Sequence, residues 1–229
     1  MGKQEISRQS VVFVEAHPDD LAGSMGTALK LAEKFDVHVI DFTHGERGLG
    51  EARHLDGTCR ATRIREERAV CSKAGFKLHW CDQVDGESFA SREACEQLAK
   101  FLKSIRPRAV FCHWPIDSHA DHYMSYAATM KAVSLAGIEP EVYFHEQDGQ
   151  SRGFVREIYV DISGVGKRKD ELVGLYACQN GPAIAERKAG AEMVYGRNSG
   201  MARAEIFGIL HGSVRPGAGV FRELDGVRM

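Results

Sequence analysis

Three ionisable side chains follow an apolar run near the start of the sequence. The run Val-Val-Phe-Val at 11–14 is soon followed by His-Pro-Asp-Asp at 17–20. The apolar run favours a buried strand of a parallel sheet, and the proline ends it because proline has no amide hydrogen to donate. His17 and Asp20 can then direct a nitrogen and an oxygen toward one divalent cation. Asp19, between them, could take a proton from water on that cation.

A second polar cluster follows another apolar run much later in the sequence. Residues 109–112 are Ala-Val-Phe-Cys, and His-Ala-Asp-His comes soon after at 119–122. The carboxyl ends of parallel strands share one edge of a sheet, where ligands bind, so we expect the two clusters to meet. His122 would complete a set of three metal ligands with one position open for water. His119 would stay free for acid chemistry.

The paired carboxylates also have a structural interpretation. Asp19 and Asp20 could cap the helix that follows, since carboxylate oxygens accept hydrogen bonds from the free amides at a helix N-terminus. Taken alone, the first cluster supports both interpretations about equally. The second cluster shifts the balance toward a metal site formed by His17, Asp20 and His122.

The two motifs resemble those of the zinc-dependent N-acetylglucosaminyl deacetylases of the PIG-L or LmbE-like family. That family has His-Pro-Asp-Asp-Glu after a strand and His-Pro-Asp-His far downstream. Here the motifs read His-Pro-Asp-Asp-Leu at 17–21 and His-Ala-Asp-His at 119–122. Leu21 and Ala120 depart from the family pattern, but neither replaces an inferred ligand or catalytic group.

Weaker matches between the two motifs extend the resemblance over most of the sequence. Residues 43–48 are similar to the family's Thr-x-Gly-Glu-x-Gly turn, and residues 63–66 are similar to its Arg-x-x-Glu helix. The resemblance implies that Glu46 and Arg63 bind substrate, although an arginine on a charged helix is often simply solvated or paired with neighbouring glutamates. His145 ends another apolar run, and we expect it at the same sugar-lining edge.

The resemblance implies removal of an acetyl group from an N-acetylglucosamine-type conjugate by a metal-activated water. Zn²⁺ is the expected metal, and Fe²⁺ could occupy the same nitrogen and oxygen ligands. Asp19 would act as the general base, and His119 would stabilise the oxyanion and protonate the departing amine. Asp121 would orient His119, or would cap the helix after it.

Other functions remain open at this point. The chain could be a non-catalytic α/β module that binds a sugar or nucleotide and retains a metal site, or an amidase that acts on a non-sugar amide. A dinucleotide-binding domain would have Gly-x-Gly-x-x-Gly after its first strand, whereas this sequence has His-Pro-Asp-Asp there.

Length and composition suggest a single compact enzyme domain over residues 1–229. The sequence is 43% hydrophobic, enough for a sizeable core, and its formal net charge of -2 gives no general attraction to nucleic acid. The six cysteines form no CxxC pair, so we expect reduced thiols. Residues 1–5 lack the apolar core of a signal peptide, and no run approaches the roughly 18 apolar residues of a membrane span. We therefore expect a cytoplasmic protein with a small-molecule substrate, and the family resemblance allows a homo-oligomer.

Strand-like and helix-like segments alternate, which predicts a Rossmann-like three-layer α/β sandwich with at least five strands in a mostly parallel sheet. The metal site would lie at the carboxyl ends of the strands. We expect strands at 11–14, 36–42, 76–81, 109–113, 141–146 and 154–162. We expect helices at 21–35, 60–74, 92–104, 123–136 and 167–178, followed by a less regular tail.

Overall fold

The computed structural model describes residues 8–214 and 219–229. The segment 1–5, on which the expectation of no signal peptide rests, lies outside the described residues. Among the described helices, none is long and apolar enough to cross a membrane. The strands are β1 Ser10–Glu15, β2 Asp36–Thr43, β3 Lys77–Gln83, β4 Ala109–His113, β5 Glu141–His145, β6 Ile158–Asp161, β7 Ala204–Ile209 and β8 Val227–Arg228. The helices are η1 Asp20–Gly23, α1 Met25–Leu31, α2 Glu51–Leu55, α3 Thr58–Ala74, α4 Arg92–Ile105, α5 Ala120–Ala136, α6 Gly166–Val173, η2 Ala177–Gln179, α7 Gly181–Ser199 and η3 Val220–Glu223.

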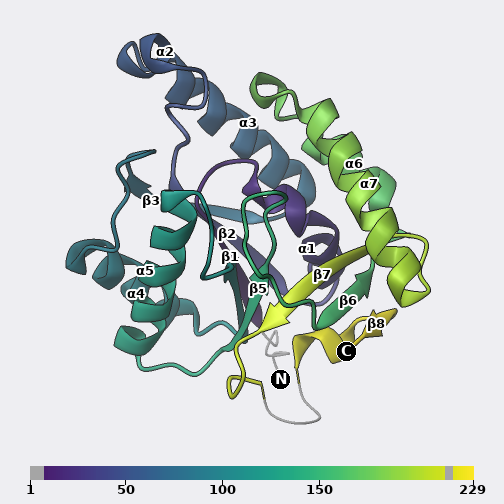
Figure 1. Cartoon of the computed structure of the whole chain (residues 1–229). Helices are drawn as coiled ribbons and strands as arrows, with labels where there is room; N and C mark the ends of the chain where they lie inside the picture. Colours follow the sequence, from purple (N-terminus) through teal and green to yellow (C-terminus); the bar gives the residue numbers. More distant parts are fainter. Residues whose placement is uncertain (1–7, 215–218) are drawn as a thin grey trace, which may run out of the picture.

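The strands form one sheet in the order β3-β2-β1-β4-β5-β7-β6-β8 (Figure 1). β1 lies between β2 and β4 and pairs in parallel with both, and β3 and β5 extend the parallel part on either side. β7 is antiparallel to both β5 and β6. The expectation of a mostly parallel sheet with at least five strands is confirmed.

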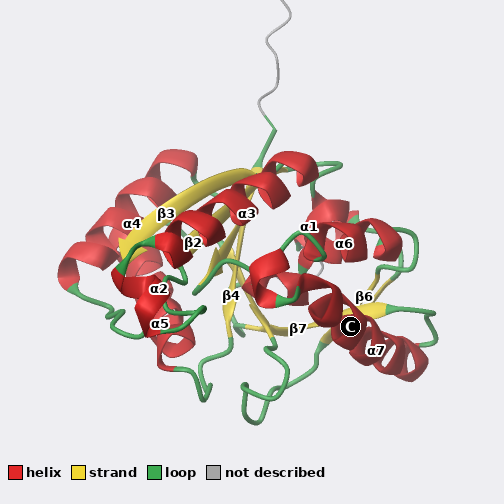
Figure 2. Cartoon of the chain, turned by 90° about the horizontal axis from the view of Figure 1, so that it is seen from above, coloured by secondary structure: helices red, strands yellow, loops and turns green. Residues whose placement is uncertain are grey.

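Helices cover both faces of this sheet (Figure 2). Val11 and Phe13 of β1 face a core shared with α1, α3, α6 and α7, whereas Val12 and Val14 face a core shared with α4 and α5. A strand buried on both faces needs apolar residues at successive positions. This double burial explains the uninterrupted apolar run that precedes the first polar cluster.

The chain after residue 178 is more regular than the sequence suggested, and the expectation of an irregular tail was wrong. α7 spans 19 residues and β7 six. α7 buries Ala185, Lys188, Glu192 and Gly196 rather than a stripe of large apolar side chains, so the apolar periodicity that marks most helices is absent. Its buried Glu192 is satisfied by Lys169 of α6, which also donates to Glu205 of β7.

Smaller differences affect the ends of elements. The expected helix 21–35 is the short 3-10 helix η1 followed by α1, and the expected helix 167–178 ends as α6 at Val173. The strand expected over 154–162 is confined to Ile158–Asp161. In contrast, α5 begins three residues earlier than expected, at Ala120, which places the second polar cluster in its first turn.

Substitution of Phe111 tests how much the central aromatic stack stabilises the fold. Phe111 is fully buried in β4 and stacks on Phe13 of β1 and Tyr143 of β5. We expect Phe111→Ala to lower the free energy of unfolding by about 3–5 kcal/mol, because it removes buried apolar surface and leaves a cavity. Urea denaturation measures this change. The matched control is Phe89→Ala, at a side chain that is 62% exposed, where a change within about 0.5 kcal/mol is expected. Similar losses in both variants would contradict the assigned packing.

Candidate metal and active site

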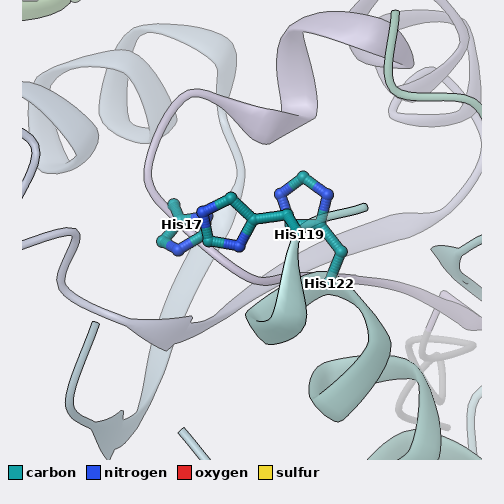
Figure 3. A group of neighbouring side chains, drawn as sticks. All are labelled: His17, His119 and His122. Carbon is teal, nitrogen blue, oxygen red and sulfur yellow. The ribbon is translucent and has the colours of Figure 1, made fainter. Parts of the chain in front are cut away.

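Parallel pairing of β1 with β4 brings the two polar clusters together. His17 follows the carboxyl end of β1, and Asp20 begins η1. His119 is the N-cap of α5, and His122 lies in its first turn. Figure 3 shows His17, His119 and His122 as neighbours, and the ring centroids of His17 and His122 are 5.4 Å apart.

The three side chains predicted as metal ligands lie close together, although potential ligand atoms within 4.8 Å of one another group them differently: His17 with His119 and His122, and Asp20 with His113 and His122. Asp20 Oδ2 lies 3.2 Å from His17 Nδ1 and 3.5 Å from His122 Nε2. Ligand atoms held about 2.0–2.1 Å from one tetrahedral ion are about 3.3–3.5 Å apart. Two imidazole nitrogens and a carboxylate oxygen suit Zn²⁺ or Fe²⁺. The donor set and its spacing therefore fit such an ion.

Carboxylates hold the other nitrogens of the two histidines. His17 Nε2 lies 3.1 Å from Asp121 Oδ2 and 3.2 Å from Asp85 Oδ1. His122 Nδ1 lies 3.1 Å from Asp117 Oδ1. Such contacts fix the tautomer and the ring orientation of a metal-binding histidine.

The supporting residues Asp85 and Asp117 were missed by the sequence analysis. Asp117 carried a usable signal, because it stands two residues before His119 in an Asp-Ser-His-Ala-Asp-His run. Asp85 carried none, since it lies in a loop after β3 that no pattern connects with the other polar clusters.

The carboxylates around the two ligand histidines favour positive charge at this point. Burial opposes a raised pKa in both rings, yet hydrogen bonds to Asp121, Asp20 and Asp85 raise the pKa of His17 well above its usual value. Asp20 and Asp117 raise the pKa of His122 in the same way. The same anionic surroundings would stabilise a divalent cation.

Asp19 contacts a buried arginine. Its backbone is left-handed, with φ of 93°, a conformation that costs about 1–3 kcal/mol in a non-glycine residue and is often found at functional sites. Arg63 Nη2 donates to Asp19 Oδ1 at 2.9 Å and also to the Pro18 carbonyl. Burial raises the pKa of Asp19 to about 6, and Arg63 opposes that shift.

His119 is held by a backbone amide rather than by a carboxylate. The Asp121 amide donates to His119 Nδ1 at 3.3 Å, so a neutral His119 ring carries its proton on Nε2. Burial, followed by the neighbouring His17 and His122, lowers the pKa of His119.

Asp121 takes neither of the positions expected for it. Its carboxylate does not contact His119 but accepts from Ser88 Oγ at 2.6 Å and from the Gly86 amide at 2.7 Å, besides contacting His17. The helix cap is His119 itself. The physical reason is that Asp121 lies inside the first turn, where its amide faces the cap while its side chain projects toward β1. Its pKa is held low by these hydrogen bonds, although burial alone would raise it.

A pocket of about 520 Å³ opens over the ligand set. Arg63, predicted to bind substrate, lies in its wall. Glu46 and His145 are not among the lining residues. Glu46 accepts from the His44 amide, and His145 is 1% exposed within the sheet. The opposite wall, which the sequence analysis missed, consists of Gln147, Asp148, Gly149, Gln150, Gln179, Ile184, Arg187 and Lys188.

The sequence is similar to those of known deacetylases. The diacetylchitobiose deacetylase of Thermococcus kodakarensis is 30% identical over 136 residues, which cover 57% of this chain and 51% of that protein. The 1D-myo-inositol 2-acetamido-2-deoxy-alpha-D-glucopyranoside deacetylase of Kineococcus radiotolerans is 27% identical over 164 residues, covering 55% of this chain and 45% of that protein. The chain thus matches only about half the length of these relatives.

A solved structure shows that the fold extends beyond these relatives. The 4-carboxy-2-hydroxymuconate hydratase of Pseudomonas putida KT2440 superposes with a TM-score of 0.79 at 21% identity, covering 92% of this chain and 100% of that one. Residues 12–133 match the sequence model of the family described as PIG-L: GlcNAc-PI de-N-acetylase. Because this match covers more than half of the sequence, the chain belongs to the PIG-L family.

Proposed function

We propose that the chain is a metal-dependent N-deacetylase that hydrolyses the acetamide of an N-acetylglucosamine-type conjugate. The observation that carries the proposal is that Asp20 Oδ2 lies within 3.5 Å of both His17 Nδ1 and His122 Nε2, with Asp19 and His119 in the wall of the same pocket. The named relatives act on acetylated amino sugars, which supports the same substrate class here. Zn²⁺ is the proposed metal, with Fe²⁺ as the alternative.

When bound, the metal would act as a Lewis acid that activates water and polarises the amide carbonyl. Asp19, adjacent to the ligands in sequence and present in the pocket wall, takes the proton from the attacking water. Arg63 holds the Asp19 carboxylate in place through its 2.9 Å contact. The left-handed backbone of Asp19 also fits this role, because such strain is often found at functional sites.

His119 stabilises the oxyanion by donating a hydrogen bond from Nε2. Its Nδ1 already accepts from the Asp121 amide, which leaves the proton on Nε2, facing the pocket. Burial and the neighbouring His17 and His122 lower the pKa of His119, which favours the neutral ring, and a neutral imidazole is a poor proton donor to the amine. Asp19, protonated in the first step, is then the proton source for the leaving amine. We therefore propose that Asp19 makes both proton transfers, in place of the prediction from the sequence that His119 makes the second.

The pocket suits a polar substrate of about the size of a disaccharide. Its wall opposite the ligand set is rich in amide and charged side chains, and Ile184 is the one aliphatic side chain among the described lining residues. Such a wall can donate to and accept from sugar hydroxyl groups. The experiment that tests the proposed function is an acetate-release screen of the zinc-loaded protein with N-acetylglucosamine, diacetylchitobiose and an N-acetylglucosaminyl-inositol.

The screen also separates the other candidate functions. Acetate release from at least one sugar is expected. Release only from non-sugar acetamides would make the chain a different amidase, and binding without release would make it a non-catalytic module. The hydratase neighbour shares only the fold, and no hydration of a substrate double bond is expected.

The Asp117 carboxylate should strengthen metal binding by orienting His122. We expect Asp117→Ala to weaken Zn²⁺ binding by about 10–100-fold, the usual effect of losing such a supporting contact. Asp117→Asn should lose less, because its amide oxygen can still accept from His122 Nδ1. Competition with a chromophoric chelator measures both. Asp148→Ala, which alters the pocket wall at a residue paired with Lys188, is the control and should bind zinc as the unmodified chain does. Equal affinity of Asp117→Ala and the control would remove Asp117 from the metal site.

The two unligated groups should control turnover without holding the metal. We expect Asp19→Asn and His119→Ala each to lower turnover by roughly 10² or more, with zinc content unchanged by elemental analysis. Asp82→Asn is the control, because that side chain is 65% exposed and lies outside the pocket wall. Near-normal turnover in either variant would refute its proposed role. Loss of zinc from Asp19→Asn would instead make Asp19 a ligand.

A further inference from the structure

A second group of potential metal ligands lies in the sheet directly beneath the first. Glu15 of β1, His113 of β4 and His145 of β5 come from three adjacent strands. His113 and His145 are paired in register, and Glu15 stands next to His113 because Val14 pairs with Cys112. The three side chains are 0%, 0% and 1% exposed. They form one row across the sheet, above the apolar row of Phe13, Phe111 and Tyr143.

This row is short of hydrogen-bond partners. Both carboxylate oxygens of Glu15 and both ring nitrogens of His145 have none among the described residues, and His113 Nδ1 also has none. Within 4.0 Å of the Glu15 carboxylate, no lysine or arginine of the described chain provides a counter-charge. A fully buried carboxylate needs a compensating positive charge or a proton.

The spacing within the row is that of ligands around one ion. Glu15 Oε2 lies 3.0 Å from His145 Nε2 and 3.5 Å from His113 Nε2. At 3.0 Å a hydrogen bond would be expected, yet the geometry of one is absent. Ligand atoms about 2.0–2.1 Å from a shared tetrahedral ion lie about 3.3–3.5 Å apart. All three residues offer ligand atoms within 4.8 Å of one another.

We propose that Glu15, His145 and His113 bind a second divalent transition-metal ion beneath the catalytic site. Two imidazoles and a carboxylate form a set that zinc commonly uses. Glu15 and His145 are the stronger ligands, because His113 Nε2 also accepts a hydrogen bond from the Ala16 amide at 3.0 Å, and an ion must compete with that amide for the lone pair.

Asp20 connects the two sites. Its Oδ2, which already lies beside His17 and His122, is also 3.5 Å from His113 Nε2. His113 stacks on His122 with ring centroids 4.2 Å apart. The second ion therefore supports the ligands Asp20 and His122 from below, where the pocket does not reach, and its role is to hold these ligands rather than to contact substrate.

Counting metal ions tests this proposal independently of any enzyme activity. The whole chain is stripped with chelator, reloaded with excess Zn²⁺ alone, passed over a desalting column and measured by elemental analysis. About two zinc ions per chain are expected for the unmodified protein, and about one for Glu15→Gln and for His145→Gln. His122→Ala should also hold about one zinc ion, because it loses the ion of the proposed catalytic site and keeps the ion bound by Glu15 and His145.

A neighbouring carboxylate provides the matched control. Asp41 of β2 pairs in register with Glu15, is 1% exposed and likewise has an oxygen without a hydrogen-bond partner. It does not belong to the three-residue group, so Asp41→Asn should keep both ions. Circular dichroism establishes that each variant is folded.

Anomalous diffraction from zinc-loaded crystals of the unmodified chain gives a second measurement that does not depend on any variant folding. Two peaks are expected, one between Glu15 and His145. The proposal would be overturned by a single zinc ion per chain, by a single anomalous peak, or by two ions retained in Glu15→Gln. A proton would then be the group that neutralises the row. If the unmodified chain holds one ion and His122→Ala holds none, the proposed catalytic site stands and the second site does not.

Discussion

The carboxylate of Asp20 is the contact on which the whole site depends. Its Oδ2 lies within 3.5 Å of nitrogens from His17, His113 and His122, and these belong to the β1 and β4 regions and to α5. Such a meeting requires β1 and β4 to be adjacent and parallel, because only then do their carboxyl ends share an edge. The uninterrupted apolar strands, buried on both faces, fix that adjacency. The core thus determines where the ligands meet.

The site carries an unusual density of buried ionisable groups, and their arrangement reduces the cost of burial. Hydrogen bonds to Asp121, Asp20 and Asp85 raise the pKa of His17 well above its usual value, although burial opposes this shift. Buried charge is costly unless it is paired. A divalent ion bound at this point would pair with the same carboxylates, and its binding would then be coupled to the folding of this region.

The sequence could predict the parts of the site that local pattern encodes. His17 and Asp20 follow a strand at a spacing that two ligands of one ion can adopt. His122 follows a second strand of the predicted parallel sheet. The meeting of the two clusters could therefore be predicted, because the carboxyl ends of parallel strands share one edge. The orientation of Asp121 could not be predicted, because it depends on Gly86 and Ser88, which arrive from a loop distant in the sequence. α7 was missed because it buries Lys188 and Glu192, which satisfy partners on other elements. Tertiary pairing of this kind leaves no periodic apolar signal.

The two sides of the pocket come from different parts of the fold, which explains how one fold can serve different reactions. The side with the proposed ligands is built from the strand ends and the first turn of α5, whereas the opposite wall comes from the loop after β5, from η2 and from α7. Hydrogen bonds link the two sides, among them those from Gln147 Nε2 to the Asp20 carbonyl at 2.9 Å and from Ser151 Oγ to Asp117 Oδ2 at 3.0 Å. Loop residues vary more readily than the elements that they connect. The hydratase with the same fold is consistent with that freedom, since function belongs to the site rather than to the fold. We therefore expect the choice of substrate to depend on residues of this wall such as Gln179 and Arg187.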